Sequence, residues 1–128
     1  MQKILIVEDH IDIRQLLAIT LESEYEILEA SDGVEALQLA KREQPFAILL
    51  DIMLPGELDG LQVLNAIKTD SQLKDIRIAM VTARGQRSDY QLGEKYGADG
   101  YFVKPFSPLQ IVNWLHKQSH QLDARPST

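Results

Sequence analysis

The chain has 128 residues, of which 45% are hydrophobic and 25% charged, and this length suits one globular domain with a substantial core. A formal net charge of −6 argues against nonspecific binding to nucleic acid, and the absence of cysteine excludes disulfides and thiolate metal sites. No apolar run is long enough to span a membrane. The first three residues lead directly into the apolar run at residues 4–7 without the layout of a signal peptide, so we expect a cytoplasmic domain.

Short apolar runs alternate with helical patterns through the first half of the chain. Residues 4–7 predict the first strand, and the helix after it has apolar residues at helical spacing: Ile13, Leu16, Leu17 and Leu21. Residues 25–30 carry two glutamates among apolar residues, which is typical of a strand at the edge of a sheet. Asp32 and Glu35 have the spacing of a capping box and predict the start of a second helix.

The same alternation continues in the second half of the chain. Residues 46–50, 76–81 and 101–103 predict three more strands. Residues 60–68 predict a helix, and its expected buried residues are Leu61, Leu64 and Ile67.

The last two helices differ in how strongly the sequence specifies them. Ser107 is placed to cap the final helix and Pro108 fits its first position. Between residues 85 and 97, only three side chains are expected to anchor a helix, so we expect it to be mobile: Tyr90, Leu92 and Tyr96. The chain is polar after about Gln118, so we assign residues 1–120 to one domain and 121–128 to a polar tail or the start of a linker.

Five strands, each followed by a helix, predict an α/β domain with a parallel sheet and helices on both faces. Ligands of such sheets bind beyond the carboxyl ends of the strands, where the strand order reverses. In a doubly wound, flavodoxin-like sheet of order 2-1-3-4-5, the first and third strands are neighbours at that point. The residues that follow the strands are therefore the first candidates for a site.

Polar residues follow four of the predicted strands. Glu8 and Asp9 follow the first strand, Asp51 the third, Thr82 the fourth and Lys104 the fifth. Three carboxylates that lie close together repel one another, and a hard divalent cation such as Mg²⁺, which prefers oxygen ligands, removes that repulsion. No cluster of histidine or cysteine in the sequence indicates a softer metal.

Each of these residues also has an ordinary structural explanation. A single carboxylate can cap a helix or form a turn, Thr82 can be a turn residue, and Lys104 can be a solvated charge. Their placement favours a site, because all of them lie at the carboxyl ends of strands and none at the amino ends. The histidines are scattered along the chain, and we expect all three at the surface: His10, His116 and His120.

Four motifs carry a resemblance to a known family. ILIVEDH, ILLDIMLP, VTA and GYFVKPF, in this order and spacing, resemble the receiver domain of two-component response regulators, and the chemotaxis-type single-domain receiver in particular. The resemblance covers roughly residues 2–120. It implies a flavodoxin-like fold of five βα units, and a signalling domain that catalyses only its own phosphorylation and dephosphorylation.

The resemblance implies a role for each residue at a strand end. Asp51 would accept a phosphoryl group from a sensor histidine kinase or a phosphotransfer protein. Thr82 would bind a phosphoryl oxygen after the transfer, and Lys104 would form a salt link to the phosphoryl group. Tyr101 matches an aromatic switch position, whose side chain turns inward when the threonine moves.

The resemblance also implies a Mg²⁺ site and a cis proline. Asp9 and Asp51 would bind Mg²⁺ directly and Glu8 mainly through water, with the backbone carbonyl of Met53 as a further ligand. The peptide bond that precedes Pro105 would be cis.

The implied partners are proteins. The surface formed by the fourth helix, the fifth strand and the last helix would signal to a downstream protein or to an effector domain outside this segment, and a weak dimer would use the same surface. Gly100 stands where regulators with winged-helix effectors usually have a second aspartate for a dimer salt bridge. The kinase would contact the first helix around residues 11–17 and the loop after the fifth strand. We expect this segment to make no direct contact with nucleic acid or membrane.

Three alternatives stay open from the sequence. A receiver-like module that binds partners without being phosphorylated would not need the acidic pocket, Thr82 and Lys104. Phosphatases that resemble the haloacid dehalogenases carry an Asp-x-Asp pair after the first strand, where this chain has Glu8 and Asp9. A flavin-binding protein of the same topology would need a phosphate-binding loop at that point, where the two carboxylates would repel phosphate.

Overall fold

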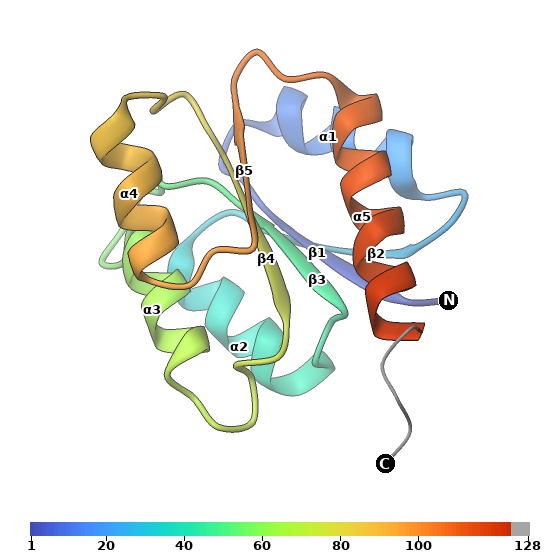
Figure 1. Cartoon of the computed structure of the whole chain (residues 1–128), viewed down its shortest axis with the longest axis horizontal. Coiled ribbons are helices and arrows are strands. Elements are labelled where there is room, and N and C mark those ends of the chain that lie inside the picture. The colour runs from blue at the N-terminus through green and yellow to red at the C-terminus, as the bar shows by residue number, and fades with distance from the viewer. Residues whose placement is uncertain (124–128) are drawn as a thin grey trace.

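The computed structural model describes residues 1–123 and contains one sheet of five parallel strands in the order β2-β1-β3-β4-β5 (Figure 1). The strands are β1 Lys3–Val7, β2 Glu26–Ala30, β3 Ala47–Leu50, β4 Arg77–Thr82 and β5 Gly100–Val103. The helices are α1 Ile11–Leu21, α2 Gly33–Glu43, α3 Gly60–Lys68, α4 Arg87–Lys95 and α5 Pro108–Asp123. This confirms the predicted flavodoxin-like fold and the edge position of β2. Most of the predicted tail lies outside the described residues.

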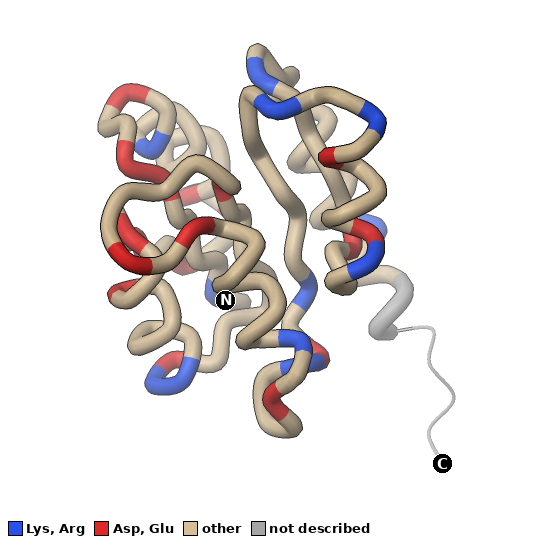
Figure 2. The backbone as a smooth tube through the Cα atoms, turned by 90° about the vertical axis from the view of Figure 1, so that its left-hand side faces the viewer, with Lys and Arg blue, Asp and Glu red and all other residues tan. Residues whose placement is uncertain are grey.

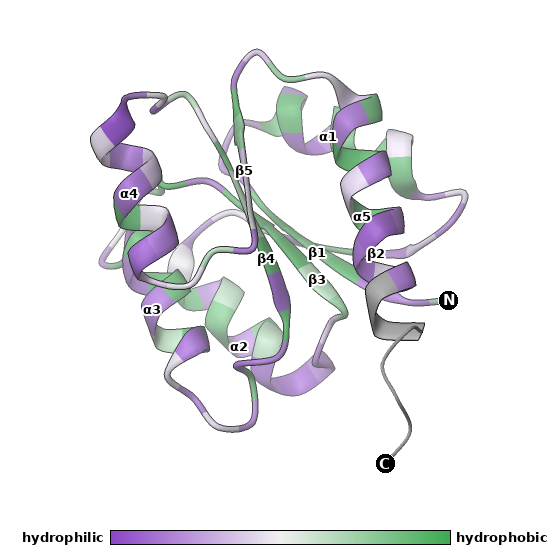
Figure 3. Ribbon diagram, viewed as in Figure 1, coloured by the Kyte–Doolittle hydropathy of each residue, from purple (hydrophilic) through white to green (hydrophobic). Residues whose placement is uncertain are grey.

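The sheet is buried on both faces because its central strands alternate their apolar side chains between two cores. Ile4 and Ile6 of β1 pack with residues of α1 and α5 on one face. Leu5 and Val7 pack with residues of α2 and α3 on the other face. Figure 3 shows the mainly hydrophobic central strands between helices that carry hydrophilic as well as hydrophobic residues. Because the helices cover the two faces of the sheet, the ends of the strands meet the connecting loops.

Charged side chains are kept mainly to the helices and the loops around the sheet (Figure 2). Within the described residues, no helix combines the length and the apolar character that a membrane span requires. The loops decide which polar residues lie at each end of the strands.

Side-chain caps open α2 and α3. Asp32 Oδ1 accepts a hydrogen bond from the Glu35 amide at 2.8 Å, as predicted, but the Glu35 carboxylate accepts from the Ser31 amide, so the box is displaced by one residue. A complete capping box that the sequence reasoning missed opens α3, where Asp59 and Gln62 each accept from the other's backbone amide at 2.9 Å. These caps fix the start of α2 and α3 next to the carboxyl end of the sheet.

The buried side of α3 differs from the predicted one. Leu64 and Ile67 are fully buried, as predicted, but Leu61 is only half-buried and Val63 takes the remaining core position. Positions 60, 63, 64 and 67 follow the i, i+3, i+4, i+7 pattern of one helix face. Leu61 lies about 100° around the helix from Gly60, which places it at the margin of that face.

Helix α4 is held differently from α3. Its buried residues are Asp89 and Gly93, so it places no large apolar side chain in the core. A Cβ on Gly93 would lie 3.2 Å from two carbons of the Tyr101 ring, so the glycine allows the ring to approach the helix closely. Leu92 and Tyr96 are half-buried. This supports the predicted weak anchoring, while the mobility itself stays a prediction.

Candidate functional site

The acidic pair and the third-strand aspartate meet because β1 and β3 are neighbours. Val7 and Leu50 are partners in the register of these strands, so Glu8 and Asp51, which follow them, leave the sheet side by side. The Asp51 amide donates to the Val7 carbonyl at 3.1 Å and continues the ladder to this point. Glu8 is 2% exposed and Asp51 is 3% exposed. Two buried carboxylates at this position need a compensating charge.

Lys104 provides that charge from the end of β5. Its Nζ donates to Glu8 Oε1 and, at 2.9 Å, to Asp51 Oδ2. Burial lowers the pKa of Lys104, but the hydrogen bonds and charges of the two carboxylates outweigh burial and raise that pKa above its ordinary value. The Lys104 amide donates to the Thr82 carbonyl at 2.8 Å, and the following peptide bond to Pro105 is cis. The ammonium therefore stays charged at physiological pH and joins β5 to β1 and β3.

Asp51 is further fixed by the loop that follows it. Its Oδ1 accepts a hydrogen bond from the Met53 amide at 3.1 Å. The Gly60 amide donates to the Ile52 carbonyl at 2.8 Å, and a Cβ on Gly60 would lie 2.0 Å from the Asp51 carbonyl oxygen. Only glycine permits this contact of the start of α3 with the end of β3, because the obstacle is backbone.

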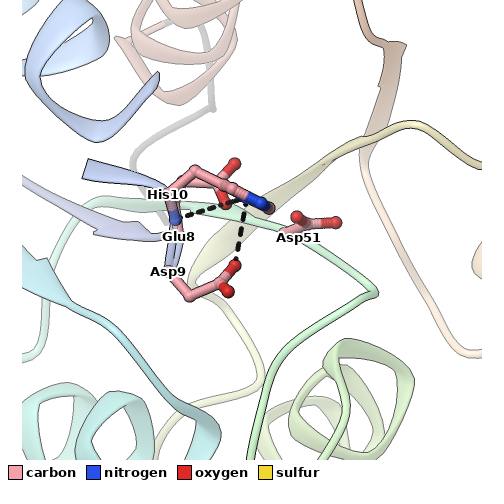
Figure 4. A group of neighbouring side chains, drawn as sticks. All are labelled: Glu8, Asp9, His10 and Asp51. Carbon is pink, nitrogen blue, oxygen red and sulfur yellow. Dashed lines mark hydrogen bonds and ion pairs between the residues drawn. The ribbon is translucent and has the colours of Figure 1, made fainter. Parts of the chain in front are cut away.

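Asp9 and His10 lie next to Glu8 and Asp51 (Figure 4). We call the group formed by Glu8, Asp9, His10 and Asp51 the acidic pocket, and Asp9 and His10 form its more exposed part. One ligand atom from each of Glu8, Asp9, His10 and Asp51 lies within 4.8 Å of the others. His10 Nδ1 is 3.2 Å from Glu8 Oε2 and 3.3 Å from Asp9 Oδ1. Three carboxylates at this spacing suit a small divalent cation, because oxygen ligands dominate the set. The donor set thus fits the predicted Mg²⁺.

Arg14 holds the loop that carries the acidic pair. One of its terminal nitrogens donates to the Glu8 carbonyl at 2.8 Å, and its Nε donates to Glu29 at 3.1 Å. The guanidinium therefore ties α1 to the end of β1 and to β2. Sequence reasoning missed this residue, and its only signal is an arginine placed one turn into the helix after the acidic pair.

Thr82 and Tyr101 lie on the β4–β5 side of the pocket. Thr82 ends β4 and is fully buried, and its Oγ1 accepts a hydrogen bond from the Arg84 amide at 3.3 Å. The Tyr101 hydroxyl donates to the Arg84 carbonyl at 2.6 Å, and its ring centroid lies 4.3 Å from that of Tyr90. Burial, followed by the nearby charge of Asp89, raises the pKa of Tyr101 to about 12. The same loop residue thus contacts both predicted switch residues.

The structure brings most of the predicted site residues together. Glu8, Asp51 and Lys104 are in direct contact, and Asp9 belongs to the same group as the two carboxylates. Thr82 is joined to Lys104 through the backbone, whereas the contact found for the Tyr101 hydroxyl is with the loop after β4. The roles assigned to these residues stay predictions.

The histidines are exposed, as predicted. His10 was nevertheless missed as part of the site. Its signal was present, since it directly follows the acidic pair, but the sequence does not reveal that its ring turns back toward both carboxylates.

Comparisons with known proteins give a consistent result. The model of the response regulator receiver domain matches residues 4–116. The chain is 47% identical over 111 residues to the transcriptional regulatory protein SrrA of Staphylococcus aureus, a match that covers 86% of this chain and 44% of that protein. The chain therefore spans less than half the length of the curated relatives that it matches.

Solved structures agree with this match. The chemotaxis protein CheY4 of Vibrio cholerae is 36% identical, with a TM-score of 0.84 over 91% of this chain and 98% of that one. The Mn²⁺-bound form of the response regulator Rcp1 is 28% identical, with a TM-score of 0.75 over 81% of each chain.

Proposed function

Because this chain belongs to the response regulator receiver family of two-component systems, we propose that it accepts a phosphoryl group on Asp51 from a phosphohistidine. The donor is a sensor histidine kinase or a phosphotransfer protein. The observation that carries the proposal is the contact of Lys104 with both buried carboxylates at the carboxyl ends of the strands, which holds Asp51 in place beside a positive charge. We further propose that the domain works in the bacterial cytoplasm.

The transfer is a nucleophilic displacement at phosphorus. A carboxylate oxygen of Asp51 forms the new P–O bond, the P–N bond to the donor histidine breaks, and the leaving imidazole takes up a proton from solvent. Phosphoryl transfer depends mainly on positioning and on neutralising charge. Lys104 supplies one positive charge directly, and the amide of Met53 contributes a further donor beside the carboxylate.

A Mg²⁺ ion is part of this proposal. Asp9, Asp51 and the Met53 carbonyl would hold it, with Glu8 mainly through water. When bound, Mg²⁺ supplies positive charge to the oxygens of the transferring group. The oxygen-rich donor set supports this assignment, as does the Mn²⁺-bound form of a relative.

Thr82 and Tyr101 would convert phosphorylation into a change of surface. A phosphoryl group adds roughly −1.5 to −2 of charge and three acceptor oxygens. The Thr82 hydroxyl would turn toward those oxygens and weaken the hydrogen bond that it accepts from the Arg84 amide. The carbonyl of Arg84 accepts from the Tyr101 hydroxyl, so the movement would reach Tyr101. The α4–β5–α5 surface would then shift its population toward a signalling conformation.

Two surfaces are assigned to partners in this proposal. The kinase or phosphotransfer protein would contact α1 and the loop before α5. Ile11 and Leu16 of α1 and Leu109 at the start of α5 are 56%, 47% and 65% exposed. The output would pass through α4–β5–α5 to a downstream protein or to an effector domain of a longer regulator. A weak dimer at that surface would lack the salt bridge from position 100, because Gly100 has no carboxylate. A Cβ at this position would lie 2.7 Å from the Trp114 indole nitrogen, so the tryptophan takes the space of a side chain.

Phosphorylation by acetyl phosphate tests the proposal. We expect intact-mass analysis to detect one added phosphoryl group on the wild type with Mg²⁺, and none with a chelator or in Asp51→Asn. The adduct should be labile in base, as an acyl phosphate is. Beryllofluoride, which mimics the phosphoryl group without turnover, distinguishes fast hydrolysis from a pocket that binds no phosphoryl group. If neither the adduct nor beryllofluoride binding is detected, the remaining candidate is a module that binds partners without being phosphorylated. The intact acidic pocket does not favour that candidate.

A further inference from the structure

We propose that His10 is an additional metal ligand of the acidic pocket, through Nδ1, and lets the pocket bind nitrogen-preferring divalent cations such as Ni²⁺ more tightly than an all-oxygen pocket would. This inference rests on the proposed function, because it places a further donor at the proposed Mg²⁺ site. It concerns which cation the pocket prefers, and no part of it requires that the phosphoryl transfer use the new ligand.

The direction of the imidazole is the first observation. His10 is the N-cap residue of α1, yet its side chain makes no capping hydrogen bond. Its ring turns back over the pocket, as Figure 4 shows, so that Nδ1 faces Glu8 and Asp9 together. The 3.2 Å contact of Nδ1 with Glu8 Oε2 is a hydrogen bond, and it holds the ring, which is 65% exposed, at the mouth of the pocket.

The spacing of the donor atoms is the second observation. Adjacent ligands of an octahedral ion at about 2.1 Å from the metal lie about 3.0 Å apart. His10 Nδ1 lies 3.2 Å from Glu8 Oε2 and 3.3 Å from Asp9 Oδ1, close to that separation. Asp9 Oδ1 and His10 Nδ1 therefore need only small movements to share one cation, beside which Glu8 binds mainly through water.

The arrangement of Lys104 is the third observation. Its ammonium binds Glu8 Oε1 and Asp51 Oδ2, so it occupies one oxygen of each buried carboxylate from the inner side. The other Glu8 oxygen, Oε2, is the one that faces the histidine ring. Asp9 and His10 lie on the solvent side with exposed fractions of 32% and 65%, so a cation reaches them without displacing Lys104.

The chemistry of the ligands gives the consequence. Imidazole is a common ligand of transition metals, whereas Mg²⁺ favours oxygen and keeps much of its water. For a site with nitrogen and oxygen donors, affinity rises along the series from Mn²⁺ to Ni²⁺ and Cu²⁺. His10 therefore adds little to Mg²⁺ binding and much to Ni²⁺ binding, so its effect appears in the ratio of the two affinities.

Titration calorimetry with Ni²⁺ and with Mg²⁺ tests the proposal at pH 8, where an ordinary imidazole is neutral. Wild type is compared with His10→Ala and with His10→Gln, which keeps a polar side chain but lacks the ring nitrogen. His116→Ala is the matched control, because His116 pairs with Glu24 at 2.7 Å and belongs to no acidic pocket. We expect the Ni²⁺/Mg²⁺ affinity ratio to fall at least about tenfold in both His10 variants and to stay unchanged in the control.

Two results would overturn the proposal. An unchanged ratio in His10→Ala would show that the ring is no ligand, and an unchanged ratio in His10→Gln alone would show that it acts by hydrogen bonding. A measurement on the wild type guards against variants that do not fold: Zn²⁺ should shift the ¹⁵N resonance of His10 Nδ1, and a shift of Nε2 alone would contradict the assignment. Failure here is distinct from failure of the proposed function, which the acetyl phosphate and beryllofluoride experiments decide in the wild type with Mg²⁺.

Discussion

The pocket and helix α4 lie at the same end of the molecule, but they are supported in opposite ways. Glu8 and Asp51 follow stretches of strand, Ile4–Val7 and Ala47–Leu50, in which every residue is at most 1% exposed. In α4, by contrast, the buried residues are Asp89 and Gly93. The pocket is anchored by the close-packed strands β1 and β3. Helix α4 is held mainly by the polar contacts of Asp89 and by the Tyr101 ring against Gly93.

Under the proposed function, this difference separates chemistry from signalling. Close-packed interiors resist displacement, so Asp51, the proposed nucleophile, keeps its position relative to Lys104. Segments with few buried apolar contacts open at low free energy, so α4 can change its contacts without disturbing the sheet. The Arg84 loop connects the two regions, since its amide and carbonyl contact Thr82 and Tyr101. We therefore propose that a change at the pocket reaches α4 through this one short segment.

The largest expected effect comes from removing the cation of the pocket. Lys104→Met leaves two buried carboxylates without their ammonium partner, and the free energy of unfolding should fall by about 3 kcal/mol. Urea unfolding of the variant and of the control Lys117→Met, an exposed lysine on α5, measures this difference. Added Mg²⁺ should stabilise Lys104→Met more than the wild type. Equal stability of the two methionine variants would mean that the pocket is not rigidly charge-paired.

Two glycines, Gly56 in the loop after β3 and Gly60 at the start of α3, test whether the backbone fixes Asp51. Gly60→Ala should destabilise by about 3 kcal/mol, because the new Cβ would meet backbone atoms of Asp51 and Ile52. Gly56→Ala should cost only about 1 kcal/mol, because it has a φ of +90° but open space around it. Thermal unfolding compares the two. A larger loss for Gly56→Ala would show that turn conformation, not close packing, supports the pocket.

Much of this fold can be predicted from local sequence patterns. Apolar runs, caps and spacing placed all five strands, both ends of α3 and the starts of α2 and α5. The topology then brought the strand-end residues Glu8, Asp51 and Lys104 together. Their contact was predictable because parallel strands deliver the residues after them to a common edge. The half-buried position of Leu61 was missed because a shift of one residue rotates a helix by about 100°.

Side-chain direction in the loops was beyond the sequence. Asp89 reads as a polar helix residue, yet it is buried, where it pairs with Arg84 at 2.9 Å and accepts from the Gln86 amide at 3.1 Å. Arg14 and His10 likewise contact the pocket through rotamers and loop geometry that follow from tertiary packing. Such contacts depend on where neighbouring elements leave space, which no short-range spacing encodes.

Hydrogen exchange compares the two regions without any mutation. The amides of α3, which buries Val63, Leu64 and Ile67, should exchange through global unfolding. The amides of α4 should exchange at least about tenfold faster, because local opening of this helix exposes little apolar surface. Mass spectrometry of the peptides 60–68 and 87–95 gives both rates in one experiment. Equal protection of the two helices would contradict the division between a fixed pocket and a movable face.

The smallest expected effect is the loss of one hydroxyl. Tyr101→Phe removes the bond to the Arg84 carbonyl and should destabilise by about 0.5 kcal/mol, since the hydroxyl is partly solvated. The pKa of Tyr101 is about 12 in the folded chain and close to 10 when unfolded. The folded state alone keeps this proton between those values, so its contribution to stability is full below pH 10 and is lost as the pH rises toward 12. Ultraviolet titration should show a tyrosine near pH 12 that is lost in Tyr101→Phe, while Tyr25, whose pKa burial also raises, remains. The alkaline decline in stability should be shallower in the variant. If the variant instead loses a tyrosine that titrates near pH 10, Tyr101 does not have the raised pKa and its contact with the Arg84 loop loses this support.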